Sequence, residues 1–450
     1  MLGETVFHCE LAWLGGAEPD ADVAVHIEGA YITHVVTGVT APTGAIRLKG
    51  LTLPGLANAH SHAFHRALRS RTHGGGGTFW SWRDQMYALA AVLDPDSYFR
   101  LARATFAEMA CAGITCVGEF HYLHHDQQGT PYNDPNAMSH ALIAAANEAG
   151  LRITLLDTCY LRGGFEAELN DVQRRFSDGT ADAWVNRVEA MHGTDLAANT
   201  KLGAAVHSIR AVDADSIATV ATWANMHEVA LHAHVSEQPA ENEQCLHAYG
   251  CSPMQAISER GALSSRFSAV HATHLIPSDV GLLKESSARV CLCPTTERDL
   301  ADGIGPTPEL RAAGIAVTLG SDSHAVIDLF EEARAVEMGE RVTTLQRGIH
   351  SVTDLLRAAT SDGHASLGWS DAGRIQVGAL ADLVSISADS VRMAGMTRRT
   401  ALAAAIYSAS PTDVHHVVAG GRVVAADGRH STIDVVAELR ASIAAVTTID

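Results

Sequence analysis

The chain has 450 residues, of which 47% are hydrophobic and 18% are charged. This composition is typical of a folded enzyme and excludes an intrinsically disordered chain, which lacks the apolar residues for a core. The formal net charge of −19 argues against a nucleic-acid groove, because phosphate contacts need clustered Lys and Arg. No run of about 18 apolar residues occurs, so we expect no transmembrane helix and no membrane partner.

The cysteines and the N-terminus bear on the compartment. Eight cysteines are scattered along the chain without CxxC spacing, which predicts thiols in a reducing cytosol. Cys291 and Cys293 lie two residues apart on one expected strand, where core packing is favoured over a metal role. The segment MLGETVFHCE has acids and no basic stretch before an apolar core, so we expect no signal peptide and a cytoplasmic protein.

Both ends of the chain have the sequence pattern of short β-strands. Residues 1–52 alternate apolar and polar positions, with a turn at Glu28–Gly29. The same pattern returns after residue 374 and includes a hairpin turn at Gly420–Gly421. We therefore predict a small β-sandwich domain from residues 1–52 and 375–450, with a helix in the last stretch, TIDVVAELRASIAAV.

The middle of the chain, residues 53–374, alternates strand and helix patterns eight times. This alternation predicts an α/β protein with a (β/α)8 TIM barrel. The expected strands are LPGLANAH (53–60), TCVGEFHY (115–122), RITLLDTCY (152–160), KLGAAVHSI (201–209), ALHAHVSE (230–237), FSAVHAT (267–273), ARVCLCPT (288–295) and AVTLGSD (316–322).

A glycine run, Gly74–Gly77, follows the first of these strands in THGGGGTFWSWRDQM (72–86). Four consecutive glycines favour a mobile loop. The loop is either a plain surface linker or a lid that closes over substrate, and the sequence leaves both interpretations open.

Four phrases place metal-binding residue types at the ends of expected strands. They are LANAHSHAFHR (56–66), LHAHVSEQ (231–238), AVHATH (269–274) and VTLGSDSH (317–324). A TIM barrel assembles its active site from the carboxyl ends of its strands. His60 and His62 are two apart on an extended segment, so both imidazoles point the same way.

The chemistry of these residues predicts a metal site. His60, His62 and His234 offer neutral imidazoles and Asp322 a carboxylate, a set that suits Zn²⁺ with one position open for water. Bound Zn²⁺ lowers the pKa of its water to about 7, which makes it a nucleophile at neutral pH. His and Asp also accept Fe, Mn or Co, so the ligands leave the metal's identity open.

These motifs resemble the amidohydrolase superfamily, and within it the formimidoylglutamate deiminases of histidine degradation. HSH, HxxE, a later His and SD mark the superfamily; HSHAFHR, FWSWR, EFHY, HSIRAV, VHATH, CPTTE and GSDSH are narrower. The resemblance implies that His60, His62, His234 and Asp322 bind the metal. It implies that Glu237 and His271 handle protons and polarise the substrate, and that Arg83, Tyr122, His207 and Arg210 bind it. His65 stands where many relatives have Gln, and either side chain can hydrogen-bond the substrate.

The implied reaction is hydrolysis of N-formimino-L-glutamate to N-formyl-L-glutamate and ammonia. Asp322 could take a proton from the attacking water, and Glu237 could deliver one to the leaving nitrogen. His271 could stabilise the tetrahedral centre. The substrate is a small dicarboxylate, which the forked guanidinium groups of Arg83 and Arg210 suit.

The resemblance also bears on metal count and assembly. Binuclear relatives use a carboxylated lysine at the end of the fourth strand, but Lys201 begins that strand here, and Lys49 and Lys284 lie outside strand ends. We therefore expect one divalent metal per chain. The resemblance further implies a homodimer.

Two other functions remain open. A related aminohydrolase acting on a heterocyclic amine, of the guanine or triazine type, would use aromatic stacking, for which Trp80 and Trp82 are available. A non-catalytic scaffold with this fold would typically lose metal ligands, and here every expected ligand is present. Metal analysis separates the scaffold from the enzymes, and a substrate panel separates the two enzymes.

Overall fold

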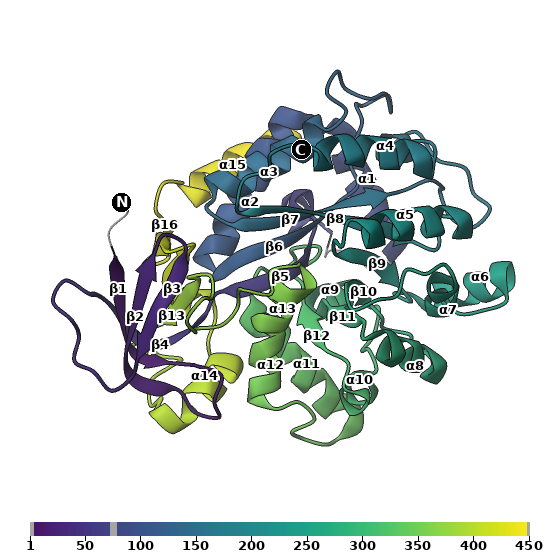
Figure 1. Ribbon diagram of the computed structural model, residues 1–450. Helices are drawn as coiled ribbons and strands as arrows, with labels where there is room; N and C mark the ends of the chain where they lie inside the picture. Colours follow the sequence, from purple (N-terminus) through teal and green to yellow (C-terminus); the bar gives the residue numbers. More distant parts are fainter. Residues whose placement is uncertain (1–3, 73–78, 448–450) are drawn as a thin grey trace.

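The computed structural model describes residues 4–72 and 79–447, and for Phe79 and Trp80 the backbone only. The glycine run, Gly74–Gly77, for which the sequence left a surface linker and a lid both open, lies outside the described residues. The chain forms a barrel of parallel strands surrounded by helices, with a second sheet at one side (Figure 1).

Eight parallel strands form the barrel, and their order in the sheet follows their order in the chain. They are β5 (Leu56–Ser61), β6 (Ile114–His121), β7 (Arg152–Cys159), β8 (Thr200–Ser208), β9 (Leu231–Val235), β10 (Phe267–His271), β11 (Arg289–Leu292) and β12 (Val317–Leu319). A parallel bridge between Ser61 and Asp322 joins the first strand to the segment after the last. The predicted TIM barrel and its eight strands are confirmed.

Helices follow the strands and cover the outside of the barrel (Figure 1). They are η1 (Ala63–Leu68), α1 (Phe79–Val92), α2 (Pro95–Cys111), α3 (Ala137–Glu148), η2 (Gln173–Phe176), α4 (Ala181–His192), α5 (Ala214–Met226), α6 (Pro239–Tyr249), α7 (Pro253–Glu259), α8 (Pro277–Ser286), α9 (Pro294–Asp299), α10 (Thr307–Ala313), α11 (Leu329–Thr344), α12 (Val352–Ala359) and α13 (Ser361–Ser366). Their apolar faces close the core against the strands, and β6 and β7 are buried along their whole length. Strands covered on both faces read as nearly continuous apolar runs, which is why the sequence predicted them.

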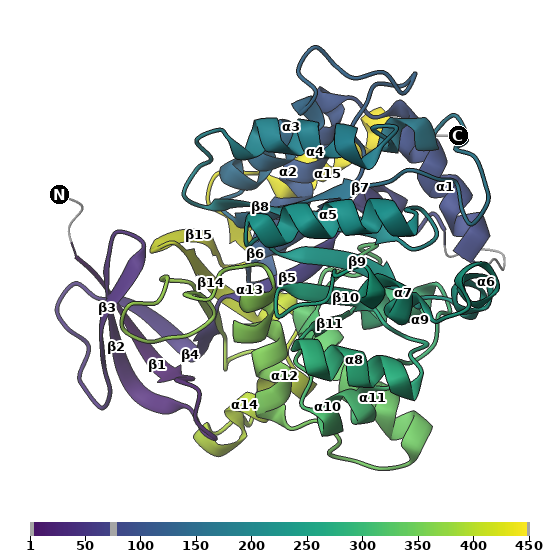
Figure 2. The ribbon, with the colours of Figure 1, turned by 45° about the vertical axis from the view of Figure 1, so that its right-hand side comes forward.

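The second sheet combines both ends of the chain, as predicted, and lies beside the barrel in both views (Figures 1 and 2). Its strands are β1 (Thr5–Ala12), β2 (Asp20–Glu28), β3 (Tyr31–Val36), β4 (Ile46–Pro54), β13 (Leu383–Ile386), β14 (Val414–Ala419), β15 (Arg422–Ala426) and β16 (Arg429–His430). They are hydrogen bonded in one continuous order, β16-β15-β14-β13-β4-β1-β2-β3. The expected turns at Glu28–Gly29 and Gly420–Gly421 connect β2 to β3 and β14 to β15.

Several contacts tie this sheet to the barrel. β4 ends one residue before β5 begins, so one segment of chain passes from the second sheet into the barrel. Arg152, at the start of β7, forms a buried ion pair with Asp382, which lies just before β13. The backbone N–H of Gly420 also donates to Asp382, at 2.8 Å. One buried carboxylate therefore links the barrel, β13 and the β14–β15 turn.

The helical segments after residue 390 also contact the barrel's outer helices. They are η3 (Arg398–Thr400), α14 (Ala401–Tyr407), η4 (Pro411–Asp413) and α15 (Val435–Val446). α14 packs against α11 and α12, and the predicted C-terminal helix, α15, packs against α2. An ion pair between Arg103 and Glu438 joins α2 to α15. Within the described part of the chain, no helix is both long and apolar enough to cross a membrane.

Candidate active site

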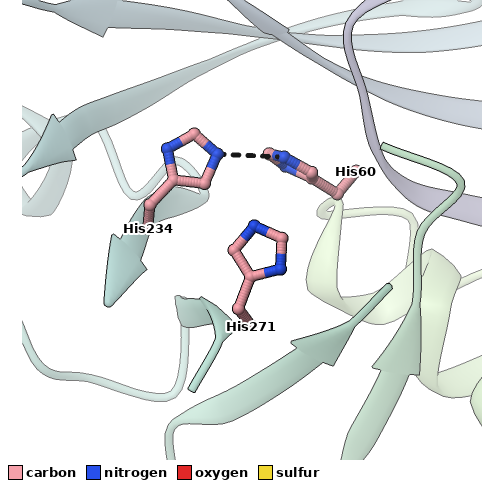
Figure 3. Close-up of side chains that lie close together, drawn as sticks. All are labelled: His60, His234 and His271. Atoms are coloured by element: carbon pink, nitrogen blue, oxygen red, sulfur yellow. Dashed lines mark hydrogen bonds between the residues drawn. The ribbon is translucent and has the colours of Figure 1, made fainter. Parts of the chain in front are cut away.

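The four residues predicted to bind a metal converge at the carboxyl end of the barrel. The Nε2 atoms of His60 and His234 lie 3.1 Å apart, and a dashed line joins their rings in Figure 3. The Oδ1 atom of Asp322 lies 3.4 Å from the Nε2 atoms of both His60 and His62. Tetrahedral ligands about 2.0–2.1 Å from a Zn²⁺ ion would be separated by about 3.3 Å. The donor atoms and their spacing therefore fit one divalent metal.

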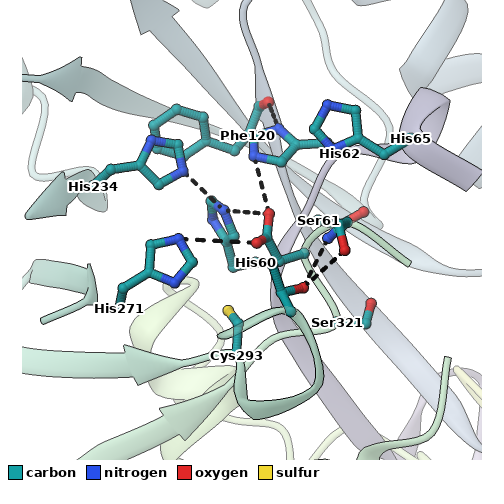
Figure 4. Close-up of polar contacts among 12 residues, drawn as sticks. His60, Ser61, His62, His65, Phe120, His234, His271, Cys293 and Ser321 are labelled. Atoms are coloured by element: carbon teal, nitrogen blue, oxygen red, sulfur yellow. Dashed lines mark hydrogen bonds and ion pairs between the residues drawn. The ribbon is translucent and has the colours of Figure 1, made fainter. Parts of the chain in front are cut away.

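Main-chain carbonyls orient two of these imidazoles. The Nδ1 atom of His62 lies 2.9 Å from the carbonyl oxygen of Phe120, and that of His234 lies 2.9 Å from the carbonyl oxygen of His207. An Nδ1–H that donates to a carbonyl leaves Nε2 deprotonated and aimed at the centre, as a metal requires. In Figure 4 the rings of His60, His62, His234 and His271 surround this common centre, and His65 lies beyond His62.

Burial determines the protonation of this cluster. Burial and the neighbouring His60 lower the pKa of His62 to about 3. Burial also lowers the pKa of His60 and of His234. Although burial alone would raise the pKa of Asp322, its contact with His60 and the nearby imidazoles hold it below its usual range. The site therefore presents neutral imidazoles and an ionised carboxylate, the forms that bind metals.

A buried glutamate that the sequence interpretation missed, Glu119, supports the first pair of histidines. One oxygen of its carboxyl group lies 2.6 Å from the Ser61 hydroxyl, and the other accepts a hydrogen bond from the Ala63 backbone N–H at 2.7 Å. These contacts fix the chain on both sides of His62. Glu119 directly precedes Phe120, whose carbonyl orients His62, so two consecutive residues of β6 position this imidazole.

His271, at the end of β10, lies among three carboxylates. Its Nε2 atom is 3.7 Å from Glu237 and 3.9 Å from Asp322, and its Nδ1 atom is 3.4 Å from Glu297. Burial alone would lower the pKa of His271, but these carboxylates raise it well above its ordinary value. A protonated imidazole here can donate a hydrogen bond to negative charge that develops in the pocket.

The backbone takes unusual conformations at these strand ends. Ser236, His271 and Asp322 have φ values of 53°, 65° and 40°, in the left-handed region that side chains rarely adopt. Such conformations persist where surrounding contacts impose them, and they concentrate at functional sites. The tight turn at Ser236 brings Glu237 back toward the site, as the HxxE spacing predicted.

Arg210 lies between two carboxylates, an arrangement that the sequence did not predict. Its Nη2 atom is 3.1 Å from Oε2 of Glu237, and its Nε atom is 3.1 Å from Oε2 of Glu241. Burial alone would lower the pKa of Arg210, but these two carboxylates raise it. The predicted substrate-binding arginine thus contacts the predicted proton donor directly.

A pocket of about 270 Å³ opens onto the metal-binding residues and is the size of a small-molecule site. All the predicted site residues line it except His60, which is fully buried beneath. The Tyr122 hydroxyl lies 3.0 Å from Nε2 of His65. The guanidinium of Arg83 lies 5.4 Å from the ring centre of Tyr87. The structure therefore brings the predicted substrate-binding residues and the metal residues to one cavity.

Aromatic and amide side chains that were not predicted complete the pocket wall. Tyr160 and Tyr87 line it, and the Gln173 side-chain amide donates to both hydroxyls, at 2.8 and 3.0 Å. Trp82 also lines the pocket, whereas the side chain of Trp80 lies outside the described part of the chain. Trp82 and Tyr87 lie on α1, Tyr160 directly follows β7 and Gln173 begins η2, so no single local spacing in the sequence connects these residues.

The cysteines and the fourth-strand lysine mostly lie where the sequence predicted, but Cys111 and Cys251 are only partly buried and Cys293 follows β11. All eight cysteines are free thiols. Cys291 and Cys293 pack with Ala59 and Val270 in a small apolar cluster beneath the site. Lys201 is the second residue of β8, at the opposite end of that strand from His207, and its Nζ atom lies 4.5 Å from the ring centre of Trp369.

The three histidines of the HYLHH segment (residues 121–125) lie in or beside a buried ion-pair network away from the pocket. Asp157 pairs with Arg187 through both carboxylate oxygens, at 2.8 and 2.9 Å. Arg187 also pairs with Asp178, which lies 3.3 Å from Nε2 of His125. His124 and His121 lie close to Asp157. Because Arg187 already occupies both oxygens of Asp157, this cluster fits a structural ion pair better than a second metal.

Comparison with known proteins identifies the family. The model of the amidohydrolase family matches residues 51–424. The chain belongs to the amidohydrolase family. Formimidoylglutamate deiminase from Pseudomonas aeruginosa is 36% identical over 399 residues, covering 86% of this chain and 87% of that protein. The resemblance stated from the sequence motifs is confirmed.

Other relatives of this amidohydrolase are named for different substrates. A 5-methylthioadenosine/S-adenosylhomocysteine deaminase from Natronomonas pharaonis is 28% identical and covers 85% of this chain and 83% of that protein. Among solved structures, an amidohydrolase from Brucella melitensis is 30% identical with a TM-score of 0.88, covering 98% of this chain and 99% of that one. A zinc complex of atrazine chlorohydrolase from Arthrobacter aurescens, at 22% identity and a TM-score of 0.85, covers 98% of this chain and 100% of that one and shares the fold.

Proposed function

We propose that this amidohydrolase converts N-formimino-L-glutamate and water to N-formyl-L-glutamate and ammonia, a reaction of histidine degradation. The observation that carries the proposal is that Arg83 and Arg210 line the same small pocket as the metal-binding residues. Guanidinium groups bind carboxylates through paired hydrogen bonds, and this substrate has two carboxylates. The 36% identity to a formimidoylglutamate deiminase supports the same substrate.

One divalent metal, with zinc as the first choice, would be held by His60, His62, His234 and Asp322. The fit rests on three imidazole nitrogens and one carboxylate oxygen that share a centre. When bound, such a metal supplies Lewis acidity that makes water a stronger nucleophile. Lys201, the lysine of the fourth strand, lies at the opposite end of β8 from His207, which supports one metal rather than two.

The chain's own residues provide the proton transfers. Water adds to the formimino carbon, and the bond from that carbon to the terminal nitrogen breaks. Asp322 takes a proton from the attacking water, and Glu237 carries a proton to the departing nitrogen, which leaves as ammonia. The protonated imidazole of His271, 3.7 Å from Glu237 and 3.9 Å from Asp322, stabilises negative charge at the tetrahedral carbon.

The opposite side of the pocket would hold the rest of the substrate. Arg83 and Arg210 bind its carboxylates, and His207 lies beside Arg210 in sequence and in the pocket wall. Burial raises the pKa of Tyr122 well above its ordinary value, so its hydroxyl remains a hydrogen-bond donor. Burial lowers the pKa of His65 well below its ordinary value, so its neutral ring can share a hydrogen bond with Tyr122 or with substrate.

A second candidate is deamination of a heterocyclic amine. The observation in its favour is the aromatic wall formed by Trp82, Tyr122, Tyr160 and Phe176. Relatives that are 27–28% identical are named as deaminases of 8-oxoguanine and of adenosine derivatives. Two guanidinium groups in a pocket of this size favour the dicarboxylate, because each can bind a carboxylate through paired hydrogen bonds, which a neutral heterocycle does not offer.

The test is ammonia release by purified protein of known metal content. We expect rapid release from N-formimino-L-glutamate with about one metal per chain. The same protein is assayed with 8-oxoguanine, guanine and 5-methylthioadenosine. Release from a heterocycle and none from N-formimino-L-glutamate would replace the first candidate with the second. Metal-free protein with no activity after zinc is added would contradict both.

The remaining proposals concern organisation and location. We infer domain boundaries at residues 52/53 and 374/375, with the barrel between two segments that share the second sheet. The eight free thiols support a reducing, cytosolic location. We also propose a homodimer, which light scattering of the purified protein would test.

A further inference from the structure

Arg210 is shared between a residue of the proposed chemistry and a residue with no assigned role. Its Nη2 atom contacts Glu237, the proposed proton donor, at 3.1 Å. Its Nε atom contacts Glu241 at 3.1 Å from the other side. One guanidinium is therefore shared by two carboxyl groups, and with both of them ionised the three side chains carry one net negative charge.

Glu241 is held more firmly than Glu237. It lies in the first turn of α6, and its side chain is fully buried. Its second oxygen, Oε1, accepts the Ser236 backbone N–H at 3.0 Å. Ser236 is the left-handed residue directly before Glu237. One carboxylate thus fixes both the arginine and the turn from which Glu237 extends.

The two carboxylates therefore respond differently to an incoming anion. Burial raises the pKa of Glu241, and Arg210 is the strongest influence in the opposite direction, so its carboxylate form depends on this contact. Glu237 lines the pocket, and its polar contacts among the described residues are with Arg210 and His271. Glu237 contacts the Nη2 atom of Arg210 and Glu241 contacts the Nε atom. A substrate carboxylate that binds the Nη2 atom therefore competes with Glu237 and leaves the contact with Glu241 in place.

We propose that Glu241 is a positioning residue that anchors Arg210 while the substrate carboxylate replaces Glu237 on the guanidinium. Displacement releases Glu237 to carry its proton, so the proton donor is freed only when a carboxylate-bearing substrate is bound. This inference rests on the proposed function. It assigns Glu241 to substrate selection: a compound without that carboxylate leaves Glu237 paired with Arg210 and reacts slowly.

The first experiment measures kcat and KM for N-formimino-L-glutamate in Glu241→Gln, with metal content determined in parallel. With its second anion gone, Arg210 pairs more tightly with Glu237. We expect kcat to fall about tenfold to a hundredfold, with little increase in KM. Glu241→Asp retains the charge and should recover part of kcat. General loosening of the site would instead raise KM and lower kcat together, without recovery by Asp.

A double-mutant cycle with Arg210→Gln separates this role from a structural one. If Glu241 acts through Arg210, Glu241→Gln should change kcat by no more than about twofold when Arg210 is already absent. Independent, multiplicative effects would overturn the proposal. The matched control is Glu340→Gln, a buried glutamate on α11 that accepts from Thr307 at 2.8 Å outside the pocket, and it should match the wild type.

Truncated substrates test the selection directly. N-formimino-4-aminobutyrate lacks the α-carboxylate and N-formimino-2-aminobutyrate lacks the γ-carboxylate. One of them cannot displace Glu237, and Glu241→Gln should leave its already low kcat unchanged. Sensitivity of both compounds to the substitution, equal to that of the full substrate, would contradict the inference.

Two further outcomes are distinguishable. If the wild type releases ammonia from N-formimino-L-glutamate and Glu241→Gln matches it, only this inference fails; if the wild type releases none, the proposed function fails with it. Should Glu241→Gln not fold, Arg210→Lys leaves Glu241 intact. A single ammonium cannot present two separated edges, so kcat should fall, and a wild-type kcat would overturn the proposal.

Discussion

The two walls of the pocket are built differently. The metal-side wall consists of His62, His234 and Asp322, with His60 buried beneath them, and the substrate-side wall consists of His65, Arg83, Tyr122, His207 and Arg210. The metal-side residues lie at strand ends, where backbone carbonyls and buried side chains hold them. The substrate-side residues contact other side chains, such as His65 with Tyr122 and Arg210 with Glu237. Side-chain contacts can exchange with a ligand, whereas the strand ends provide a fixed frame.

The largest effect is expected on the metal-side wall, from Asp322→Asn. The substitution removes a negative ligand and the proposed proton acceptor together. We expect ammonia release to fall by about a thousandfold or more, with weakened metal retention. Metal analysis after dialysis, together with an ammonia assay, checks both parts. Near-normal turnover would show that another residue accepts the proton.

The substrate-side wall should respond without losing metal. Arg83→Ala removes a charged contact to one substrate carboxylate, so kcat/KM should fall by about a hundredfold while metal content stays normal. The matched control is Arg71→Ala, because Arg71 is exposed and does not line the pocket. It should leave kcat/KM and metal content unchanged. Loss of metal in Arg83→Ala would erase the distinction between the walls.

The difference between the walls also explains which site residues the sequence could predict. The proposed metal ligands and Glu237 were predicted because HSH, HxxE and SD lie within a few residues of strand ends, where neighbouring side chains converge on one site. Glu119 and Glu241 were missed as functional residues. Glu119 precedes a predicted site segment and Glu241 follows Glu237 by four residues, but only folding shows that each carboxylate faces a backbone N–H of a site segment.

The fold shows the same division. The eight barrel strands were predictable from buried apolar runs alternating with helices, and their sheet order follows chain order. In the second sheet β4 pairs in parallel with the nearby β1 and antiparallel with β13, which follows it by more than 300 residues in the sequence. No local pattern specifies that pairing, because it depends on where the barrel returns the chain. The Arg210–Glu237 ion pair was not predicted either, because it also joins two segments that only the fold brings together.

A smaller effect is expected behind the metal-side wall, at Glu119. Burial raises its pKa from 4.5 to about 8, so the carboxyl takes up a proton on folding. Its stabilising contribution is therefore complete below about pH 4.5 and is lost as the pH rises toward about 8. Glu119→Gln removes this dependence and can still accept from Ala63. The Tm of the variant should therefore lie below that of the wild type at pH 4.5, and the difference should become smaller as the pH rises toward 8. Calorimetry of the metal-free proteins measures this difference.

The substitution Glu119→Ala sharpens that result. It removes the contacts to both Ser61 and Ala63, so metal affinity should fall by about tenfold to a hundredfold, as for other outer-shell partners. Competition with a chelator measures this change. If the Ala variant bound metal like the wild type, the carbonyl of Phe120 alone would suffice to orient His62.

The smallest effect is expected at the far end of the barrel, from Lys201→Met. A binuclear site would need a lysine at the carboxyl end of β8, but Lys201 lies near the start of that strand, over the ring of Trp369. We therefore expect about one metal per chain in both proteins and kcat within about twofold of the wild type. Metal analysis of both proteins, purified side by side, is the measurement. Loss of one metal from an original two would mean that the metal-side wall extends to a second ion. In that case Lys201 would take part in metal binding although it lies at the opposite end of β8 from the metal-side wall.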